Sequence, residues 1–245
     1  MGVIRLGDKN FCINKNRGIL IVFEGISGCG KSEGADNLYR YLQEEGFKTE
    51  VIEWNSNKVI RSIVKRIHSA NLLTARIYSI LQWIGLLIDY FLKVAPLLKK
   101  DYILIADRYV YTGQTRDVAN GAGKKAGTKF EKLIRKPDLI LFYNVDLQVC
   151  YERIEKRGKV LFRPDRRHQN NETLKNENLE YLIKLHNEYV KVFSDPYLTD
   201  KTNIIFLAGN NDLETLQVRK SIDEYIKLKT KSGYFVDENI ICKLS

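Results

Sequence analysis

Short apolar runs separated by longer amphipathic stretches recur along the chain. Each run is rich in Ile, Leu, Val and Phe and lacks strict polar alternation, which is typical of strands buried on both faces of a sheet. The segments between the runs are long enough to hold the crossover helices that parallel strands require. The pattern predicts five parallel strands, at residues 18–24, 48–53, 102–106, 138–145 and 203–208.

Several of the intervening segments show helical periodicity. In residues 32–45, Ala35, Leu38 and Leu42 fall on one side, and Gly46 suits the left-handed conformation that often ends a helix. Further helices are predicted at residues 60–67, 75–99, 147–156, 174–193 and 213–227. This alternation predicts a doubly wound α/β fold, with helices on both faces of the sheet and one domain over residues 1–245.

Composition and charge narrow the class of protein. With 44% hydrophobic and 29% charged residues in 245, the chain can build one sizeable core, and collagen-like or extensively disordered classes are excluded. The formal net charge of +10 attracts phosphates, whether of nucleic acids, lipids or nucleotides. The four cysteines form no C-x-x-C pair, so neither a zinc site nor a disulfide framework is indicated. A reducing, cytoplasmic location is therefore expected.

The most apolar segment covers residues 77–98. Gln82, Asp89, Lys93 and Pro96 interrupt it, so its unbroken runs are much shorter than the roughly 20 residues that a membrane span requires. We therefore expect a buried helix and no membrane partner. The same apolar face would also suit a homodimer, and the sequence leaves core and dimer surface open as alternatives.

One loop carries a recognisable chemistry. Residues 25–32, GISGCGKS, fit G-x-x-x-x-G-K-[ST] at every fixed position and lie between a predicted strand and a predicted helix. In such a loop the backbone N–H groups wrap phosphates, the lysine reaches the terminal phosphates, and the serine binds Mg²⁺. GTPases and motor ATPases share this loop, so it predicts a nucleoside triphosphate site but no reaction. The predicted ATP-binding residues are Gly25, Ile26, Ser27, Gly28, Cys29, Gly30, Lys31 and Ser32.

A charged pair follows the predicted strand at residues 102–106. The carboxyl ends of parallel strands meet at one crevice, so Asp107 and Arg108 are expected to face the same cleft as Lys31. An arginine there can hold an acceptor phosphate through two hydrogen bonds, and an aspartate can orient magnesium-bound water or the attacking group. A surface ion pair at the end of a strand is the alternative.

In these residues and their order, the chain resembles the thymidylate kinases, a family of P-loop nucleoside monophosphate kinases. The resemblance rests on FEG at 23–25, DRY at 107–109 with Thr112 after it, and KPDL at 136–139, in that order. It extends over about residues 18–227. The segments EWNS at 53–56 and YT at 111–112, the latter with Arg116 and Asp117, are similar to an archaeal-type branch of the family.

The resemblance implies transfer of the γ-phosphoryl group of ATP to a nucleoside 5′-monophosphate with Mg²⁺, most simply dTMP to dTDP. The residues it assigns to catalysis are Lys31, Arg108, Asp107, Arg153, Arg157 and Arg163, and those it assigns to Mg²⁺ are Ser32 and Asp107. The residues it assigns to the acceptor are Glu53, Trp54, Tyr78, Gln82, Arg108, Thr112 and Arg116. A basic lid is expected at about residues 158–171, where Arg163, Arg166 and Arg167 would fold over the phosphate.

Three departures from the family pattern bear on the metal and the base. Ser27 stands where an aspartate is common, so Mg²⁺ could rely on Glu24 or Asp107. An apolar stretch before Asp89 replaces a thymine-contacting Asp-Arg pair, and Gly113 replaces an asparagine. The alternative acceptors are therefore another pyrimidine nucleotide, a specialised metabolite, or a nucleoside. For a nucleoside, Glu53 would act as the general base.

A nucleotide-binding protein without turnover is the alternative from another class. No motif for nucleic-acid binding is present, so the expected partners are nucleotide substrates and no stable nucleic acid. The stretch at about residues 230–245 lies beyond the resemblance and is expected to be a docking tail.

Overall fold

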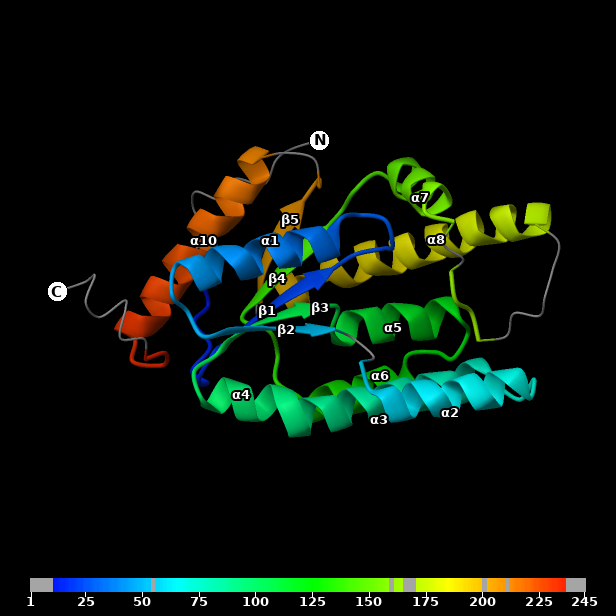
Figure 1. Ribbon diagram of the computed structural model, residues 1–245, viewed down its shortest axis with the longest axis horizontal. Helices are drawn as coiled ribbons and strands as arrows, with labels where there is room; N and C mark the ends of the chain where they lie inside the picture. The colour runs from blue at the N-terminus through cyan, green and yellow to red at the C-terminus, as the bar shows by residue number, and fades with distance from the viewer. Residues whose placement is uncertain are drawn as a thin grey trace.

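The computed structural model describes residues 11–53, 56–158, 161–164, 171–199, 202–209 and 212–236. Its centre is one parallel sheet with strand order β2-β3-β1-β4-β5 (Figure 1). The strands are β1 (Ile19–Glu24), β2 (Thr49–Glu53), β3 (Ile103–Asp107), β4 (Leu139–Tyr143) and β5 (Asn203–Leu207). All five predicted strands are thus confirmed, to within about two residues at each end.

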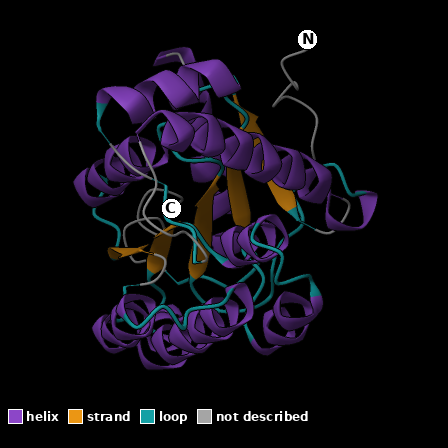
Figure 2. Cartoon of the chain, turned by 90° about the vertical axis from the view of Figure 1, so that its right-hand side faces the viewer, coloured by secondary structure: helices purple, strands orange, loops and turns teal. Residues whose placement is uncertain are grey.

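Helices cover both faces of the sheet, as predicted (Figure 2). On one face lie α1 (Lys31–Glu44) and α10 (Asp212–Lys231). The other face is covered by α3 (Ala75–Asp89), α4 (Ala95–Lys99), α5 (Val110–Ala119), α7 (Leu147–Lys156) and α8 (Asn171–Phe193). Three further helices are α2 (Lys58–Ser69), which packs on α3, and the short α6 (Lys125–Phe130) and α9 (Pro196–Thr199).

The central strands lack polar alternation because both of their faces are buried. Along β1, Ile19, Ile21 and Phe23 pack toward α1 and α10, whereas Leu20 and Val22 pack toward α3, α5 and α8. The sheet separates the two cores, and Tyr143 of β4 packs against both of them. Phe235, beyond α10, is 1% exposed and lies in the core between the sheet and helices α1 and α10. The start of the predicted docking tail therefore packs against the domain.

The long helix predicted at residues 75–99 is divided by a π-helical turn at Tyr90–Val94 (η1). Pro96 explains the turn, because a proline has no N–H to donate to the carbonyl four residues earlier and its ring clashes with that carbonyl. The N–H of Ala95 instead donates to the carbonyl of Tyr90, five residues back. The helix continues as α4.

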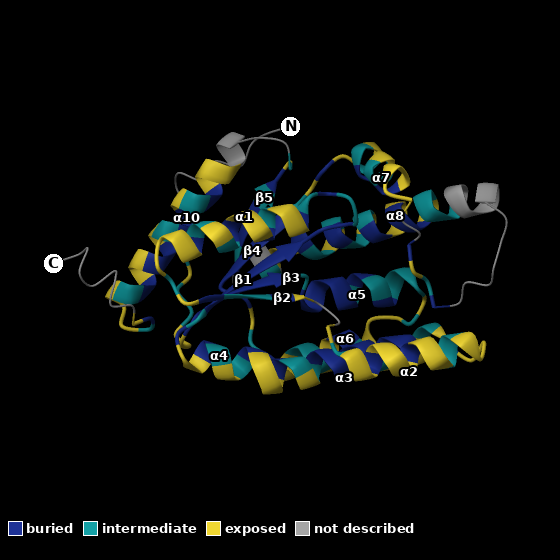
Figure 3. Ribbon diagram, in the orientation of Figure 1, coloured by how far each residue is buried: buried dark blue, intermediate teal, exposed yellow. Residues whose placement is uncertain are grey.

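The expectation that this helix is buried is wrong for one of its faces. The outward side chains are exposed along its length (Figure 3), namely those of Ile77, Ile80, Ile84, Ile88, Phe91 and Leu92. By length and composition Ala75–Lys99 is apolar enough to cross a membrane, and 33% of that window is buried in the protein. The periodicity alone could not separate a half-covered helix from a core helix, because apolar residues fall on both of its sides.

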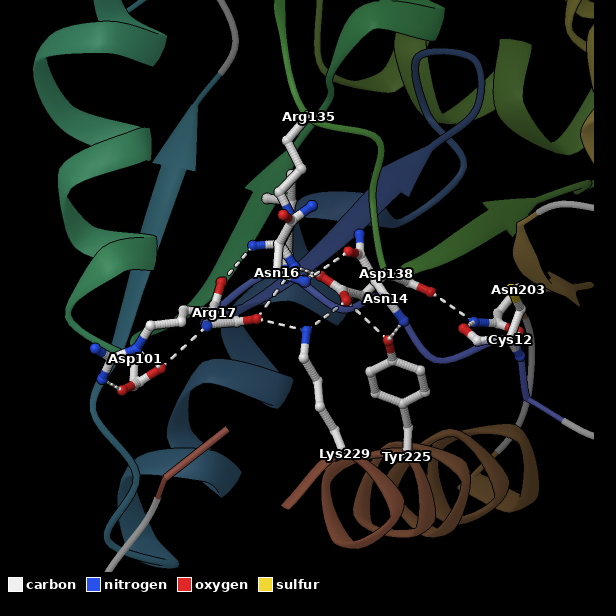
Figure 4. Close-up of polar contacts among 12 residues, drawn as sticks. Cys12, Asn14, Asn16, Arg17, Asp101, Arg135, Asp138, Asn203, Tyr225 and Lys229 are labelled. Carbon is white, nitrogen blue, oxygen red and sulfur yellow. Dashed lines mark hydrogen bonds and ion pairs between the residues drawn. The ribbon is translucent and has the colours of Figure 1, made fainter. Parts of the chain in front are cut away.

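A buried polar cluster joins the two termini of the domain at the amino ends of the strands (Figure 4). The carboxylate of Asp138 accepts hydrogen bonds from Lys229 at 2.7 Å, Tyr225 at 2.7 Å and the backbone N–H of Leu20 at 2.8 Å, and it forms an ion pair with Arg135. Lys229 and Asp138 are fully buried. The cluster attaches α10 to β1 and β4 at the end of the sheet opposite the phosphate loop.

Candidate active site

The loop at residues 25–30 leaves the carboxyl end of β1 and leads into α1, as the motif predicts. Gly30 caps α1 in the left-handed conformation, with φ 100°, and Gly28 has φ 85°. A Cβ on Gly28 would lie 2.4 Å from the carbonyl oxygen of Cys150 in α7. Glycine is therefore required there both for its backbone conformation and for close packing on α7.

Lys31 is held inside this loop. Its side chain is 4% exposed, and its Nζ donates to the carbonyl of Ile26 at 2.5 Å and lies 3.2 Å from Sγ of Cys29. Burial, followed by the nearby positive charge of Arg108, lowers the pKa of Lys31 below its ordinary value. A cation already desolvated and aimed along the loop is well placed to bind the terminal phosphates of a nucleotide.

Ser32 and Asp107 come together from different elements, as predicted. The hydroxyl of Ser32 donates to Oδ2 of Asp107 at 2.6 Å. The second oxygen of this carboxylate, Oδ1, is buried and has no hydrogen-bond partner within the described ranges. Mg²⁺ takes few protein ligands, prefers oxygen and completes its shell with water and substrate phosphates, so this pair fits it. No group of three or more His, Cys, Asp or Glu residues that could hold a metal occurs in the described part of the chain.

Arg108 has a strained backbone at the mouth of the cleft. Its φ of 79° lies in the left-handed region, which costs a non-glycine residue roughly 1–2 kcal/mol. Its N–H donates to the carbonyl of Phe23 at 3.0 Å, and its guanidinium donates to the carbonyl of Gly25 at 3.1 Å. The side chain lines a cavity with Glu53 and Asp89. These bonds fix the guanidinium beside the phosphate loop.

Glu24 organises the residues behind this cleft. Its fully buried carboxylate accepts from the N–H of Tyr109 at 2.8 Å, the hydroxyl of Thr112 at 2.7 Å and the hydroxyl of Tyr189 at 3.1 Å. Burial raises the pKa of Glu24, although these hydrogen bonds oppose the shift. Its oxygens are thus used inside the protein rather than presented to a metal. Thr112, assigned to the acceptor from the sequence, has its hydroxyl bound here.

Sequence reasoning missed Tyr189 in this network. It comes from α8, 165 residues after Glu24, and its hydroxyl lies 2.7 Å from that of Thr112. No local motif marks it, since a tyrosine on the apolar side of a helix is usually core. The available signal was Glu24 itself. A carboxylate at the end of a buried strand needs hydrogen-bond donors, and a tyrosine on a helix that covers the sheet can supply one.

The residues that the sequence assigns to the acceptor lie mainly on α3 and α5. Tyr78 and Gln82 are buried on α3, with 6% and 7% exposure, and Arg116 of α5 lies beside the Tyr78 hydroxyl. Burial raises the pKa of Tyr78, and Arg116 opposes this shift. Glu53 is exposed at the end of β2, opposite Asp107 in the sheet register. Trp54 lies outside the described residues.

The predicted lid arginines fall in three different places. The guanidinium of Arg153 donates to the carbonyl of Gly28 at 3.3 Å, so it lies at the phosphate loop. Arg157 is exposed at the end of α7. Arg163 forms an ion pair with Glu177 of α8 and lies 5.8 Å from the centre of the Tyr181 ring. Arg166 and Arg167 lie outside the described residues.

The neighbouring Phe162 packs against α2 and α3. Its ring centre is 5.1 Å from that of Tyr78 and 5.5 Å from that of His68. The described part of the predicted lid, residues 161–164, is therefore packed against α2, α3 and α8.

Comparison with known proteins agrees with this geometry. A family model for thymidylate kinase matches residues 23–222. The chain is 30% identical over 213 residues to the probable thymidylate kinase 2 of Saccharolobus solfataricus, covering 86% of this chain and 98% of that one. It is 27% identical over 222 residues to the probable thymidylate kinase of Archaeoglobus fulgidus, covering 88% and 100% of the two chains.

A bacterial relative also matches. The thymidylate kinase of Fervidobacterium nodosum is 26% identical over 199 residues, covering 72% of this chain and 98% of its own. Together with the family match and the two archaeal relatives, this confirms both the predicted family and its archaeal-type character. The chain belongs to the thymidylate kinase family.

Proposed function

We propose that the protein transfers the γ-phosphoryl group of ATP to dTMP, giving dTDP and ADP. The observation that carries this proposal is the convergence of two functions at one edge of the sheet. Lys31 and Ser32, at the start of α1, meet Asp107 at the end of β3 and Arg108 directly after it. Ser32 Oγ lies 2.6 Å from Asp107 Oδ2, and Arg108 is bound to the carbonyl of Gly25 at 3.1 Å. The thymidylate kinases named above extend the proposal to the nucleobase.

The donor side follows from the loop. The backbone N–H groups of residues 25–30 and the Lys31 ammonium would hold the β- and γ-phosphates, with positive potential from the start of α1. Arg153, already 3.3 Å from the carbonyl of Gly28, would add charge as the phosphoryl group moves. Ser32 and Asp107 would hold Mg²⁺, which neutralises phosphate charge when bound.

The acceptor side follows from Arg108. Its guanidinium, fixed beside Gly25, would hold the 5′-phosphate of dTMP in line with the γ-phosphorus. A 5′-phosphate oxygen then forms the new bond to that phosphorus while the bond to the β,γ-bridging oxygen breaks. Phosphoryl transfer needs positioning and charge stabilisation more than covalent help, and the cations around the cleft supply both.

The experiment is ADP release from ATP and Mg²⁺ with a panel of nucleosides and nucleoside monophosphates. We expect turnover of dTMP that falls by at least about 1,000-fold in Lys31→Ala, because the lysine contacts charge that develops in the transition state. Turnover of thymidine but not dTMP would move the proposal to a nucleoside kinase. No Lys31-dependent turnover of any acceptor would contradict catalysis and favour a nucleotide-binding protein.

We also propose that the protein is a homodimer through the exposed face of α3 and η1. Ile77, Ile80, Ile84, Ile88 and Phe91 recur at the spacing of three and four residues that places them on one side of a helix. An exposed apolar stripe of this kind is typical of a protein–protein or membrane interaction surface. A second copy would cover it with its own equivalent stripe.

Sedimentation equilibrium tests the dimer. Ile84→Lys should shift the protein to monomer, whereas Leu216→Lys, at an exposed leucine of α10, should not. A monomeric wild-type protein, or dissociation by both variants, would contradict this interface. We further place the protein in the cytoplasm, and the free thiols of Cys12, Cys29 and Cys150 support that location.

A further inference from the structure

The amide of Gln82 is a buried polar group that the mechanism above does not use. The residue is 7% exposed, and neither Nε2 nor Oε1 has a hydrogen-bond partner in the part of the chain that the structure describes. An unpaired buried amide costs roughly 1–3 kcal/mol, so a protein keeps one where a ligand or water pairs with it. The amide of Gln82 is therefore available to pair with a ligand or a water molecule.

Its position on α3 indicates what it would recognise. Leu86 and Asp89 follow it by four and seven residues on the same side of the helix, and both line the cavity that Arg108 also lines. Tyr78 precedes it by four residues, with Arg116 beside its hydroxyl. If Arg108 holds the 5′-phosphate, Gln82 lies farther along the same wall, on the side of the base.

The backbone of Gln82 is fixed, but the order of its amide atoms is not. The adjacent Trp83 donates from its indole N–H to Asp117 at 2.7 Å and stacks on Phe130 at 5.8 Å, which fixes α3 against α5 and α6. No hydrogen bond from a described residue distinguishes Oε1 from Nε2. A half-turn about the last side-chain bond exchanges donor and acceptor at little cost.

We propose that Gln82 recognises the base of the acceptor and that its amide turns to match either a 4-oxo or a 4-amino pyrimidine, which makes dCMP a second acceptor. With thymine or uracil, Oε1 accepts from N3–H and Nε2 donates to O4. With cytosine, Nε2 donates to N3 and Oε1 accepts from the 4-amino group. This inference rests on the proposed function, and the transfer is the same: γ-phosphoryl from ATP to a 5′-phosphate oxygen, giving dCDP and ADP.

The size of the effect follows from what each base leaves unpaired. A site with a fixed set of polar groups rejects the wrong partner by roughly 10⁴–10⁵, because its groups remain buried and unpaired. A rotatable amide leaves none unpaired with either base. The clean comparison is dUMP with dCMP, because both lack the 5-methyl group. Their kcat/KM values should agree within about tenfold, whereas dTMP gains about 10–200-fold from its methyl group.

The experiment measures kcat/KM for dTMP, dUMP and dCMP with ATP and Mg²⁺ in the full-length protein and three variants. Gln82→Met keeps the volume and removes the amide, so both dUMP and dCMP should fall by about 10–100-fold while the melting temperature stays or rises. Gln82→Arg offers only donors, which pair with O4 of uracil or N3 of cytosine but not with N3–H or the 4-amino group, so dUMP and dCMP should both fall, and by a similar factor. Gln114→Met is the matched control, because that amide is bound to Glu131 at 2.7 Å on α5.

The outcomes separate this inference from the proposed function. Turnover of dTMP and dUMP with a kcat/KM for dCMP more than about tenfold below that for dUMP would overturn the turning amide and leave the kinase intact. Unchanged kcat/KM in Gln82→Met, or an equal loss in Gln114→Met, would overturn recognition by Gln82. Absence of Lys31-dependent turnover with all three nucleotides would overturn the proposed function and, with it, this inference.

Discussion

Lys31 is a cation that the loop has already removed from water. Its pKa is lowered from 10.5 by burial first and by Arg108 second. The charged form binds phosphate, so the affinity for ATP is fully present below this lowered pKa and is lost as the pH rises through it. We expect the Kd for ATP to begin rising at a pH below 10.5, as measured by calorimetric titration across a pH series.

Two variants test the cause of this alkaline loss. Lys31→Arg stays charged throughout the range, so its ATP affinity, although weaker, should not depend on pH there. Arg108→Met removes the neighbouring charge and should move the loss to higher pH. An identical alkaline limb in all three proteins would mean that another group titrates.

Gly28 and Gly123 separate backbone strain from close packing. Both have positive φ, 85° and 81°, but a Cβ on Gly28 meets the carbonyl of Cys150 at 2.4 Å, and a Cβ on Gly123 meets nothing within 4 Å. Gly123→Ala should cost about 1 kcal/mol of stability and leave turnover unchanged. Gly28→Ala has the same strain and must also displace the phosphate loop from α7.

The displacement should appear in the kinetics. A shift of about 1 Å in a positioning loop can cost about 100-fold in rate, so we expect a loss of that order in kcat/KM for ATP in Gly28→Ala. Steady-state kinetics and thermal unfolding of both variants make the comparison. Equal kinetic behaviour of the two alanine variants would show that the contact with α7 has no role in positioning.

At the scale of elements, the sequence predicted the strands but not α5, the helix that holds Thr112 and Arg116. Continuous apolar runs marked all five strands because both faces of the sheet are covered. The helix α5 escaped notice because VYTGQTRDVA contains Gly113 and β-branched Val110, Thr112 and Thr115, which lower helix propensity. Tertiary packing against α3 and α8 forms it nonetheless.

The same limit applies to the site. The phosphate loop and the Asp107-Arg108 pair could be predicted because they follow strands whose ends must meet. The bonds of Glu24 to Thr112 and Tyr189 could not, since they join β1, α5 and α8 through side chains with no fixed spacing. Which side of α3 faces the protein also depends on packing that periodicity does not specify.

Trp83 of α3 and Asp117 of α5 join the two helices through a buried hydrogen bond. Trp83, fully buried, donates to Asp117 at 2.7 Å, and this bond lowers the pKa of Asp117 against the larger effect of burial, which raises it. Trp83→Phe keeps a ring and leaves the carboxylate without that donor, so we expect a loss of about 1–3 kcal/mol in the free energy of unfolding. Urea denaturation measures it.

The double variant Trp83→Phe/Asp117→Leu isolates the cause. Replacing both partners with apolar groups removes the carboxylate that has lost its indole donor, so the double variant should be less destabilised than the sum of the single ones. Simple additivity would show that the loss comes from ring packing on Phe130 rather than from the hydrogen bond.

At the scale of the whole molecule, the two ends of the sheet have different tasks. The carboxyl ends hold the phosphate loop and Arg108, and the amino ends hold the cluster around Asp138 (Figure 4). In that cluster one carboxylate faces two cations, Lys229 and Arg135. Burial lowers the pKa of Lys229, and Asp138 opposes this shift. The balance of charge predicts an order of stability among variants.

Asp138→Asn leaves two buried cations without their directly bonded counter-charge and should cost about 3–5 kcal/mol in the free energy of unfolding. Lys229→Met leaves Asp138 paired with Arg135 and loses the hydrogen bonds to Asp138 and to the carbonyl of Gly18, so its cost should be smaller, about 1–3 kcal/mol. Lys231→Met, at an exposed lysine of the same helix, is the control. Guanidinium denaturation gives the three values, and a larger loss in Lys229→Met than in Asp138→Asn would contradict the charge argument.

Because the cluster lies at the far end of the sheet from the phosphate loop, the kcat of the folded fraction should stay unchanged in Lys229→Met. A fall in kcat without unfolding would show that a change in the position of α10 is transmitted through β1 to the phosphate loop.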